Sequence, residues 1–196
     1  DKRASFFTRV FLFYQSLICT AASGLILFSK VITMILVSDS FYESWKYIPL
    51  LLLSPIFSCM STFLGSVYMV EKKSMLNFIT TGIGAVINVV LNFLFIPIFG
   101  VNGAAFATFL SYFVVFVLRV IDTRRFIPMH FHPMRLTFNT LVLLAQAFIM
   151  IFEVKGWIFF ELILTVLMVV ANMSALLATV AQLLLKRRPH PHHHDE

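Results

Sequence analysis

The chain has 196 residues, of which 60% are hydrophobic and only 12% are charged, whereas about a quarter of the residues in a soluble globular domain are charged. This composition excludes an ordinary water-soluble fold. The formal net charge of +6 does not indicate a nucleic-acid partner, because the basic residues flank apolar segments, where they set membrane orientation. Cys19 and Cys59 both lie inside apolar runs, so no disulfide framework is expected.

The lengths of the apolar runs predict about six transmembrane helices. A hydrocarbon core of roughly 30 Å requires about 20 helical residues, and the runs lack the alternating polarity of a membrane β-barrel. The expected spans cover residues 9–29, 46–70, 74–98, 101–121, 136–153 and 157–184. The first apolar run continues past Lys30, which fits either one long tilted helix or a span followed by an interfacial stretch. We therefore expect one all-α integral membrane domain, residues 1–188, followed by a polar His-rich tail, residues 189–196.

The distribution of basic residues predicts the orientation of these spans. Twelve of the fifteen lysines and arginines lie at one set of span ends, within residues 2–9, 72–73, 119–135 and 186–188. The opposite connections are acidic or neutral apart from Lys30, Lys46 and Lys155. Because cytoplasmic loops carry the excess of lysine and arginine, both termini are expected to be cytoplasmic. The expected location is the cell inner (plasma) membrane, with membrane lipids around the helices.

Motifs that carry catalysis or cofactors are missing from the sequence. It contains no HExxH, CxxC, Walker lysine loop or GxSxG pattern, so neither an enzyme nor a cofactor is expected. Gly82 and Gly84 lie inside an apolar helix, where small residues favour close helix packing over phosphate binding. His130 and His132 have no carboxylates or thiolates at ligand spacing, so no metal site is expected.

Polar residues inside the spans are the candidates for function. Asn88 and Asn92 share one face of the third span; hydrogen bonding between helices is the favoured interpretation, and contact with a substrate is compatible with it if the helix lines a wet cavity. Lys30 and Glu161 are ionisable groups near span ends. Burying such groups in lipid is costly, which favours a function, although both side chains could also extend to the interface. Glu161 is the candidate for ion coupling.

Residues 80–108 carry a characteristic series of elements. They are a helix with an Asn-x3-Asn pair, an Ile-Pro-x-x-Gly turn at residues 96–100 and a Gly-Ala-Ala-x-Ala-Thr helix start at residues 103–108. This series resembles the carboxy-terminal lobes of the polysaccharide-exporter branch of the multidrug/oligosaccharidyl-lipid/polysaccharide (MATE-like) flippase superfamily. Tyr68-x3-Lys72-Lys73 and the stretch from Phe41 to Pro49 are also similar, and the resemblance covers about residues 1–125.

The resemblance implies a fold and a function. Members have two pseudo-symmetric lobes around a central cavity, with about twelve to fourteen spans, and export lipid-linked oligosaccharides by alternating access. This chain would form one lobe, and we expect it to be the carboxy-terminal half of a longer protein, with the amino-terminal lobe or a second chain supplying the other wall.

Within that interpretation, candidate substrate contacts follow from charge and depth. The basic residues that could bind the phosphate are Arg9, Lys30, Lys46 and Arg119. The amides that could bind sugar hydroxyls are those of Asn88 and Asn92. One alternative is a cation-coupled drug or metabolite exporter of the same superfamily, which requires a buried carboxylate such as Glu161. Another is a truncated, non-transporting membrane lobe or scaffold.

Overall fold

The computed structural model describes residues 2–186, without the side chains of residues 39–40, 179–180 and 182–186. The order of elements is α1 (Lys2–Leu27), α2 (Ser29–Leu36), the 3-10 helix η1 (Asp39–Lys46), α3 (Ile48–Val70), α4 (Ser74–Thr123), α5 (Pro133–Ile151) and α6 (Trp157–Lys186). None of the described residues forms a strand, which confirms the predicted all-helical class. The predicted tail, residues 189–196, lies outside the described residues.

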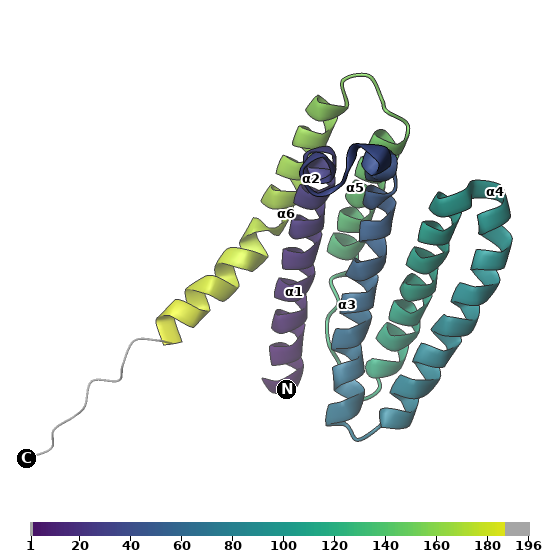
Figure 1. Ribbon diagram of the computed structural model, residues 1–196. Helices are drawn as coiled ribbons and strands as arrows, with labels where there is room; N and C mark the ends of the chain where they lie inside the picture. The colour runs from purple at the N-terminus through teal and green to yellow at the C-terminus, as the bar shows by residue number, and fades with distance from the viewer. Residues whose placement is uncertain (1, 187–196) are drawn as a thin grey trace, which may run out of the picture.

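Within residues 2–186, five helices are long and apolar enough to cross a membrane, and one of them is a hairpin. Helix α4 has 50 residues, which would extend about 75 Å if straight. Its backbone breaks at Gly100, where φ is 57° and ψ is −132°, and the chain turns back on itself (Figure 1). A positive φ of this kind favours glycine. The two arms, residues 74–99 and 101–123, therefore correspond to the third and fourth predicted spans.

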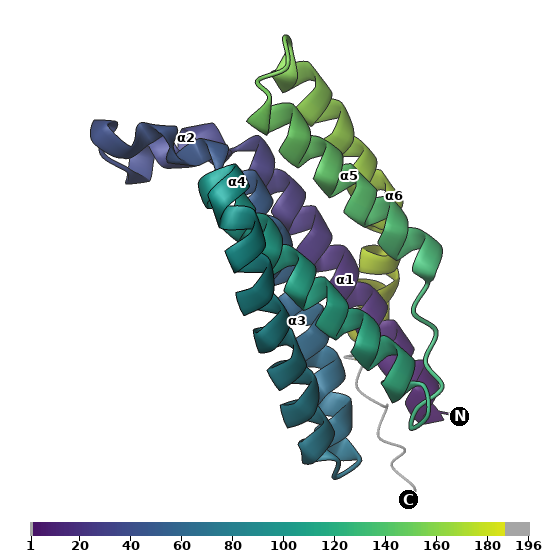
Figure 2. The ribbon, with the colours of Figure 1, turned by 90° about the vertical axis from the view of Figure 1, so that its right-hand side faces the viewer.

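The first apolar run divides into two helices rather than continuing as one. Helix α1 ends at Leu27, and Figure 2 shows that α2 lies across the end of the bundle instead of along it. Helix α2 leaves large apolar side chains uncovered, with Ile35 74% and Leu36 76% exposed. A short helix with such a face suits the boundary between headgroups and acyl chains. Of the two interpretations of this run, one long helix is wrong, and the two helices are compatible with a span followed by an interfacial stretch.

Helix α1 occupies the middle of the bundle, where it contacts α3, α5 and α6 (Figure 1). Aromatic rings fill much of this core. The ring of Phe11 on α1 lies with its centroid 5.5 Å from that of Phe63 on α3 and 6.3 Å from that of Phe116 on α4. The α4 hairpin packs mainly on α3. Its first arm exposes large apolar residues such as Phe78 and Phe93, so this arm presents an apolar face that no other described residue covers.

Candidate functional site

A cavity of about 460 Å³ lies between α3 and the two arms of α4. Ser58, Ser61 and Thr62 come from α3, at spacings that place them on one helix face. The first arm of α4 supplies Thr81, Gly84, Ala85 and Asn88, and the second arm supplies Thr108, Ser111, Tyr112, Val115 and Arg119. Hydroxyl groups thus predominate among the polar groups of the lining. We call this space the polar cavity.

Arg119 holds the end of the polar cavity that is nearest to the basic loops. Its side chain donates to three oxygens on α3 and the first arm of α4: Nε to the Thr80 hydroxyl at 3.0 Å, Nη1 to the Ser61 carbonyl at 2.6 Å, and Nη2 to the Thr81 hydroxyl at 2.9 Å. A further bond joins Nη2 to the Asn77 carbonyl at 3.3 Å. All of these acceptors are neutral oxygens.

Among the described residues, the positive charge of Arg119 has no acidic partner. The residue is only 4% exposed, and none of the ion pairs among residues 2–186 includes it. Charged groups inside a membrane span are costly and normally pair with one another or face a water-filled space. Arg119 lines the polar cavity, and the cavity wall is electropositive at this end.

Gly65 on α3 makes room for the guanidinium. A Cβ atom at this position would lie 2.8 Å from Nη1 of Arg119 and 2.9 Å from Oδ1 of Asn77. Sequence reasoning selected Arg119 but missed Gly65, Thr80 and Thr81. The two threonines follow Asn77 by about one helical turn, but nothing in their spacing indicates that a cation from a distant segment binds them.

Asn88 and Asn92 form hydrogen bonds within the α4 hairpin. The Asn88 amide donates to the hydroxyls of Thr108 at 3.3 Å and Ser111 at 3.2 Å on the opposite arm. The Asn92 amide donates to the carbonyl and the side-chain oxygen of Asn88, at 2.8 and 3.1 Å. Asn88 also lines the polar cavity, whereas Asn92 lines an adjoining shallow pocket of about 380 Å³. Both interpretations of Asn88 are therefore compatible with the structure.

The structure places Lys30 at the opposite end of the bundle from Arg119. Its ammonium nitrogen lies 3.8 Å from the ring centroid of Trp45 and 4.4 Å from that of Trp157. A cation between two tryptophan faces is stabilised by the ring quadrupoles. Lys30 thus joins α2, η1 and α6, and it does not line the polar cavity.

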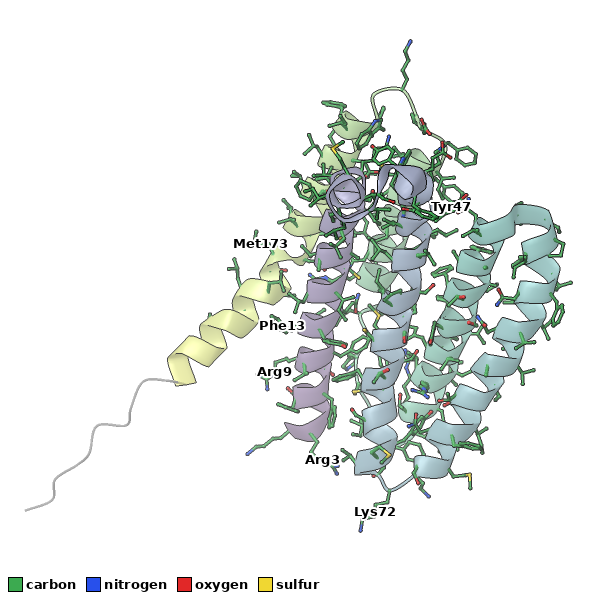
Figure 3. All side chains as sticks on the ribbon, in the orientation of Figure 1. Arg3, Arg9, Phe13, Tyr47, Lys72 and Met173 are labelled. Carbon is green, nitrogen blue, oxygen red and sulfur yellow. The ribbon has the colours of Figure 1, made fainter. Side chains whose placement is uncertain are left out.

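Lys46 and Arg9 also lie outside the polar cavity. The Lys46 ammonium pairs with Glu43 at 3.6 Å and with Glu153 at 3.5 Å, which connects η1 to the α5–α6 loop. Arg9 donates to the Ser5 carbonyl at 3.3 Å, and Figure 3 shows its side chain directed away from the bundle. Of the six predicted substrate contacts, Arg119 and Asn88 come together in one cavity, and Asn92 lies beside it.

Glu161 is fully buried between α5 and α6 rather than extended to the interface. Its Oε2 accepts a hydrogen bond of 2.8 Å from the Gln146 amide, which also donates to the Thr165 hydroxyl at 3.1 Å. The other side-chain oxygens of Glu161 and Gln146 have no hydrogen-bond partner in the part of the chain that the structure describes. Glu161 therefore belongs to a second polar site, built from different helices than the polar cavity.

The polar cavity offers one guanidinium, one amide and several hydroxyls, which together suit an anionic ligand that carries hydroxyl groups. Its volume is within the usual range for small-molecule sites. The likeness to exporters is a prediction from the motifs of residues 80–108 and their neighbours. Comparison with protein families, curated proteins and solved structures found no match for this chain.

Proposed function

We propose that the chain is one helical lobe of a membrane exporter that moves a lipid-linked oligosaccharide across the bilayer. The observation that carries this proposal is the buried guanidinium of Arg119, which has no acidic partner among residues 2–186 and faces a cavity of hydroxyl groups. Four of the five N–H groups of Arg119 already donate to protein oxygens, so a phosphate would be held by the positive charge and the one remaining N–H. Hydroxyl and amide side chains exchange hydrogen bonds with sugar hydroxyls. The motifs of residues 80–108 support the same class.

The positions of the Arg119 guanidinium and the Asn88 amide along the helices suit a ligand with a phosphate at one end. Arg119 lies four residues before the end of α4, about 6 Å along the helix axis. Thr81, which accepts a hydrogen bond from Arg119, marks the depth of the guanidinium on the first arm of α4. Asn88 follows Thr81 by seven residues, so it lies about 10 Å deeper in the span than the guanidinium. A pyrophosphate bound near headgroup depth would leave its sugars beside the deeper hydroxyls. Rocking against a second lobe, from the same protein or another chain, would then expose the ligand on the other side.

The decisive experiment measures transport by the complete protein in liposomes. The probe is a fluorescent pyrophosphate-linked oligosaccharide lipid, and the variants are Arg119→Gln, Arg119→Lys and Arg125→Gln. Losing charge-assisted hydrogen bonds costs about 1.5–3 kcal/mol each, so Arg119→Gln should lower the initial rate about tenfold or more, and Arg119→Lys less. Arg125→Gln removes an equal charge outside the cavity and should retain the rate. Liposomes that expel a cationic dye but leave the oligosaccharide lipid in place would refute the proposal.

The two asparagines provide a second test. Replacing Asn88 and Asn92 together by alanine should reduce oligosaccharide transport more than the yield of folded protein. Hydrogen bonds between membrane helices are worth only about 0.6–2 kcal/mol, so the hairpin should still form. An equal loss of transport and folded yield would assign both residues a purely structural role.

A second candidate function is cation-coupled export by the same superfamily, and the burial of Glu161 favours it. A carboxylate enclosed by helices can bind and release a proton or a small cation. In that case Glu161→Gln should remove the dependence of transport on the proton or sodium gradient. Transport that keeps its full gradient dependence in Glu161→Gln would exclude this role.

A further inference from the structure

The loop between α4 and α5 is anchored by side chains that alternate between buried and exposed. Its alternate side chains, Ile127, Met129 and Phe131, are 3%, 5% and 3% exposed and belong to the hydrophobic core. The residues between them, including His130, face outward. The backbone N–H of His130 also donates a hydrogen bond of 3.1 Å to the Thr8 hydroxyl on α1. The outward side chains are therefore held in place by core packing beneath them.

The outward side of this loop forms a pocket of about 480 Å³ that is lined by basic groups. Arg124, His130 and His132 line it, and no acidic residue of the described part of the chain does. The Arg124 guanidinium lies 5.4 Å from the centroid of the Phe131 ring, on which it rests. The side chains of Arg124 and of both histidines have no ion pair or hydrogen bond within residues 2–186. We call this space the loop pocket.

Not every arginine on this surface lacks an acidic partner among the described residues. Arg125 pairs with Asp122 at 3.7 Å, and it does not line the loop pocket. Two adjacent arginines thus differ in environment, because one is directed to a carboxylate and the other to a space bounded by histidines. This difference also supplies a matched pair of variants.

The start of α5 adds a further positive contribution to the loop pocket. His132 precedes the helix with φ of 45°, and Pro133 occupies the first helical turn. This turn contains no acidic residue, and no side chain caps it. Helix amino termini carry a partial positive charge that favours anions. The 19-residue helix therefore reinforces the positive field of Arg124 at the pocket.

We propose that the loop pocket binds the phosphate group of an anionic ligand through Arg124, His130 and His132. Phosphate oxygens accept hydrogen bonds from guanidinium and imidazole N–H groups, and basic pockets at the cytoplasmic ends of membrane helices bind anionic headgroups. The loop pocket lies at the bundle end that holds most basic residues, beside the first turns of α1. The site is separate from the polar cavity, and it does not depend on the proposed export function. The phosphate comes either from a phospholipid headgroup or from free phosphate.

The test uses the full chain in detergent micelles. Binding of dioleoylphosphatidylglycerol and of zwitterionic dioleoylphosphatidylcholine is measured by native mass spectrometry, and binding of inorganic phosphate by calorimetry. The variants are Arg124→Gln, the double variant His130→Gln with His132→Gln, and the control Arg125→Gln. Removing one basic group should weaken binding of the anion about fivefold, whereas Arg125→Gln should leave it unchanged.

Each outcome decides the proposal. Preferential binding of phosphatidylglycerol that Arg124→Gln weakens identifies a lipid headgroup as the ligand, and the same pattern for inorganic phosphate alone identifies a free phosphate. Equal weakening by Arg124→Gln and Arg125→Gln would show that diffuse surface charge attracts the anion, and the pocket would be excluded. Absence of binding by either anion would also overturn the proposal. The double histidine variant leaves both arginines in place, so it tests the pocket even if Arg124→Gln folds poorly.

Discussion

Replacing Gly65 by alanine should displace the Arg119 guanidinium from its position in the polar cavity. The added methyl group would lie 2.8 Å from Nη1 of Arg119 and 2.9 Å from Oδ1 of Asn77, both inside normal contact distance. These atoms end flexible side chains, so the side chains move while the helices remain in place. The bond most affected is the one from Nη1 to the Ser61 carbonyl, which is 2.6 Å long.

The magnitude follows from two opposing effects. A hydrogen bond from a charged group is worth about 1.5–3 kcal/mol, and its loss destabilises the fold. Alanine is favoured over glycine inside a helix by up to about 1 kcal/mol, which offsets part of that loss. We therefore expect the free energy of unfolding to fall by about 1–2 kcal/mol in Gly65→Ala.

Gly82→Ala is the matched control, because a Cβ atom at Gly82 meets no other atom within 4 Å. This variant should keep or slightly raise the free energy of unfolding. The measurement is reversible unfolding in mixed micelles with increasing denaturing detergent, followed by circular dichroism. If the two variants were equally stable, Gly65 would not position Arg119, and the explanation given for the electropositive end of the cavity would be wrong.

Three further changes test other contacts in the bundle. Gly103→Ala should destabilise the α4 hairpin by about 2 kcal/mol or more in the same unfolding assay. The added Cβ would collide with the backbone carbonyl of Phe95, which cannot move aside. A stability loss below that of Gly65→Ala would contradict this prediction. Asn139 and Asn172 exchange two hydrogen bonds of 3.0 Å. A double-mutant cycle with alanine should therefore give a coupling energy of about 0.6–1.7 kcal/mol. Additive stability losses would refute the pairing. Lys30→Met should change the tryptophan fluorescence and cost about 0.5–2 kcal/mol of stability, because the ammonium lies between two indole rings. An unchanged emission spectrum would show that this contact does not form.

The helical membrane fold could be predicted from the sequence because it depends on local properties. Apolar length sets which segments can cross a bilayer, and every backbone polar group there must be satisfied within the helix. The reversal after the third span was also predictable, because Pro97 and Gly100 interrupt the apolar run where the two arms meet. The sequence left open whether the first run was one helix, because hydropathy does not report the direction of a helix axis.

The grouping of the polar side chains was decided by tertiary structure alone. Arg119 and Lys30 are both basic residues near span ends, yet one faces a cavity beside Gly65 and the other lies between two tryptophans. Glu161 likewise turns inward to Gln146 instead of extending to the interface. The sequence by itself thus determined that this is a chain of membrane-crossing helices and where most of them begin and end. The rotation of each helix relative to its neighbours, which depends on side-chain packing across segments distant in sequence, decided which polar groups meet.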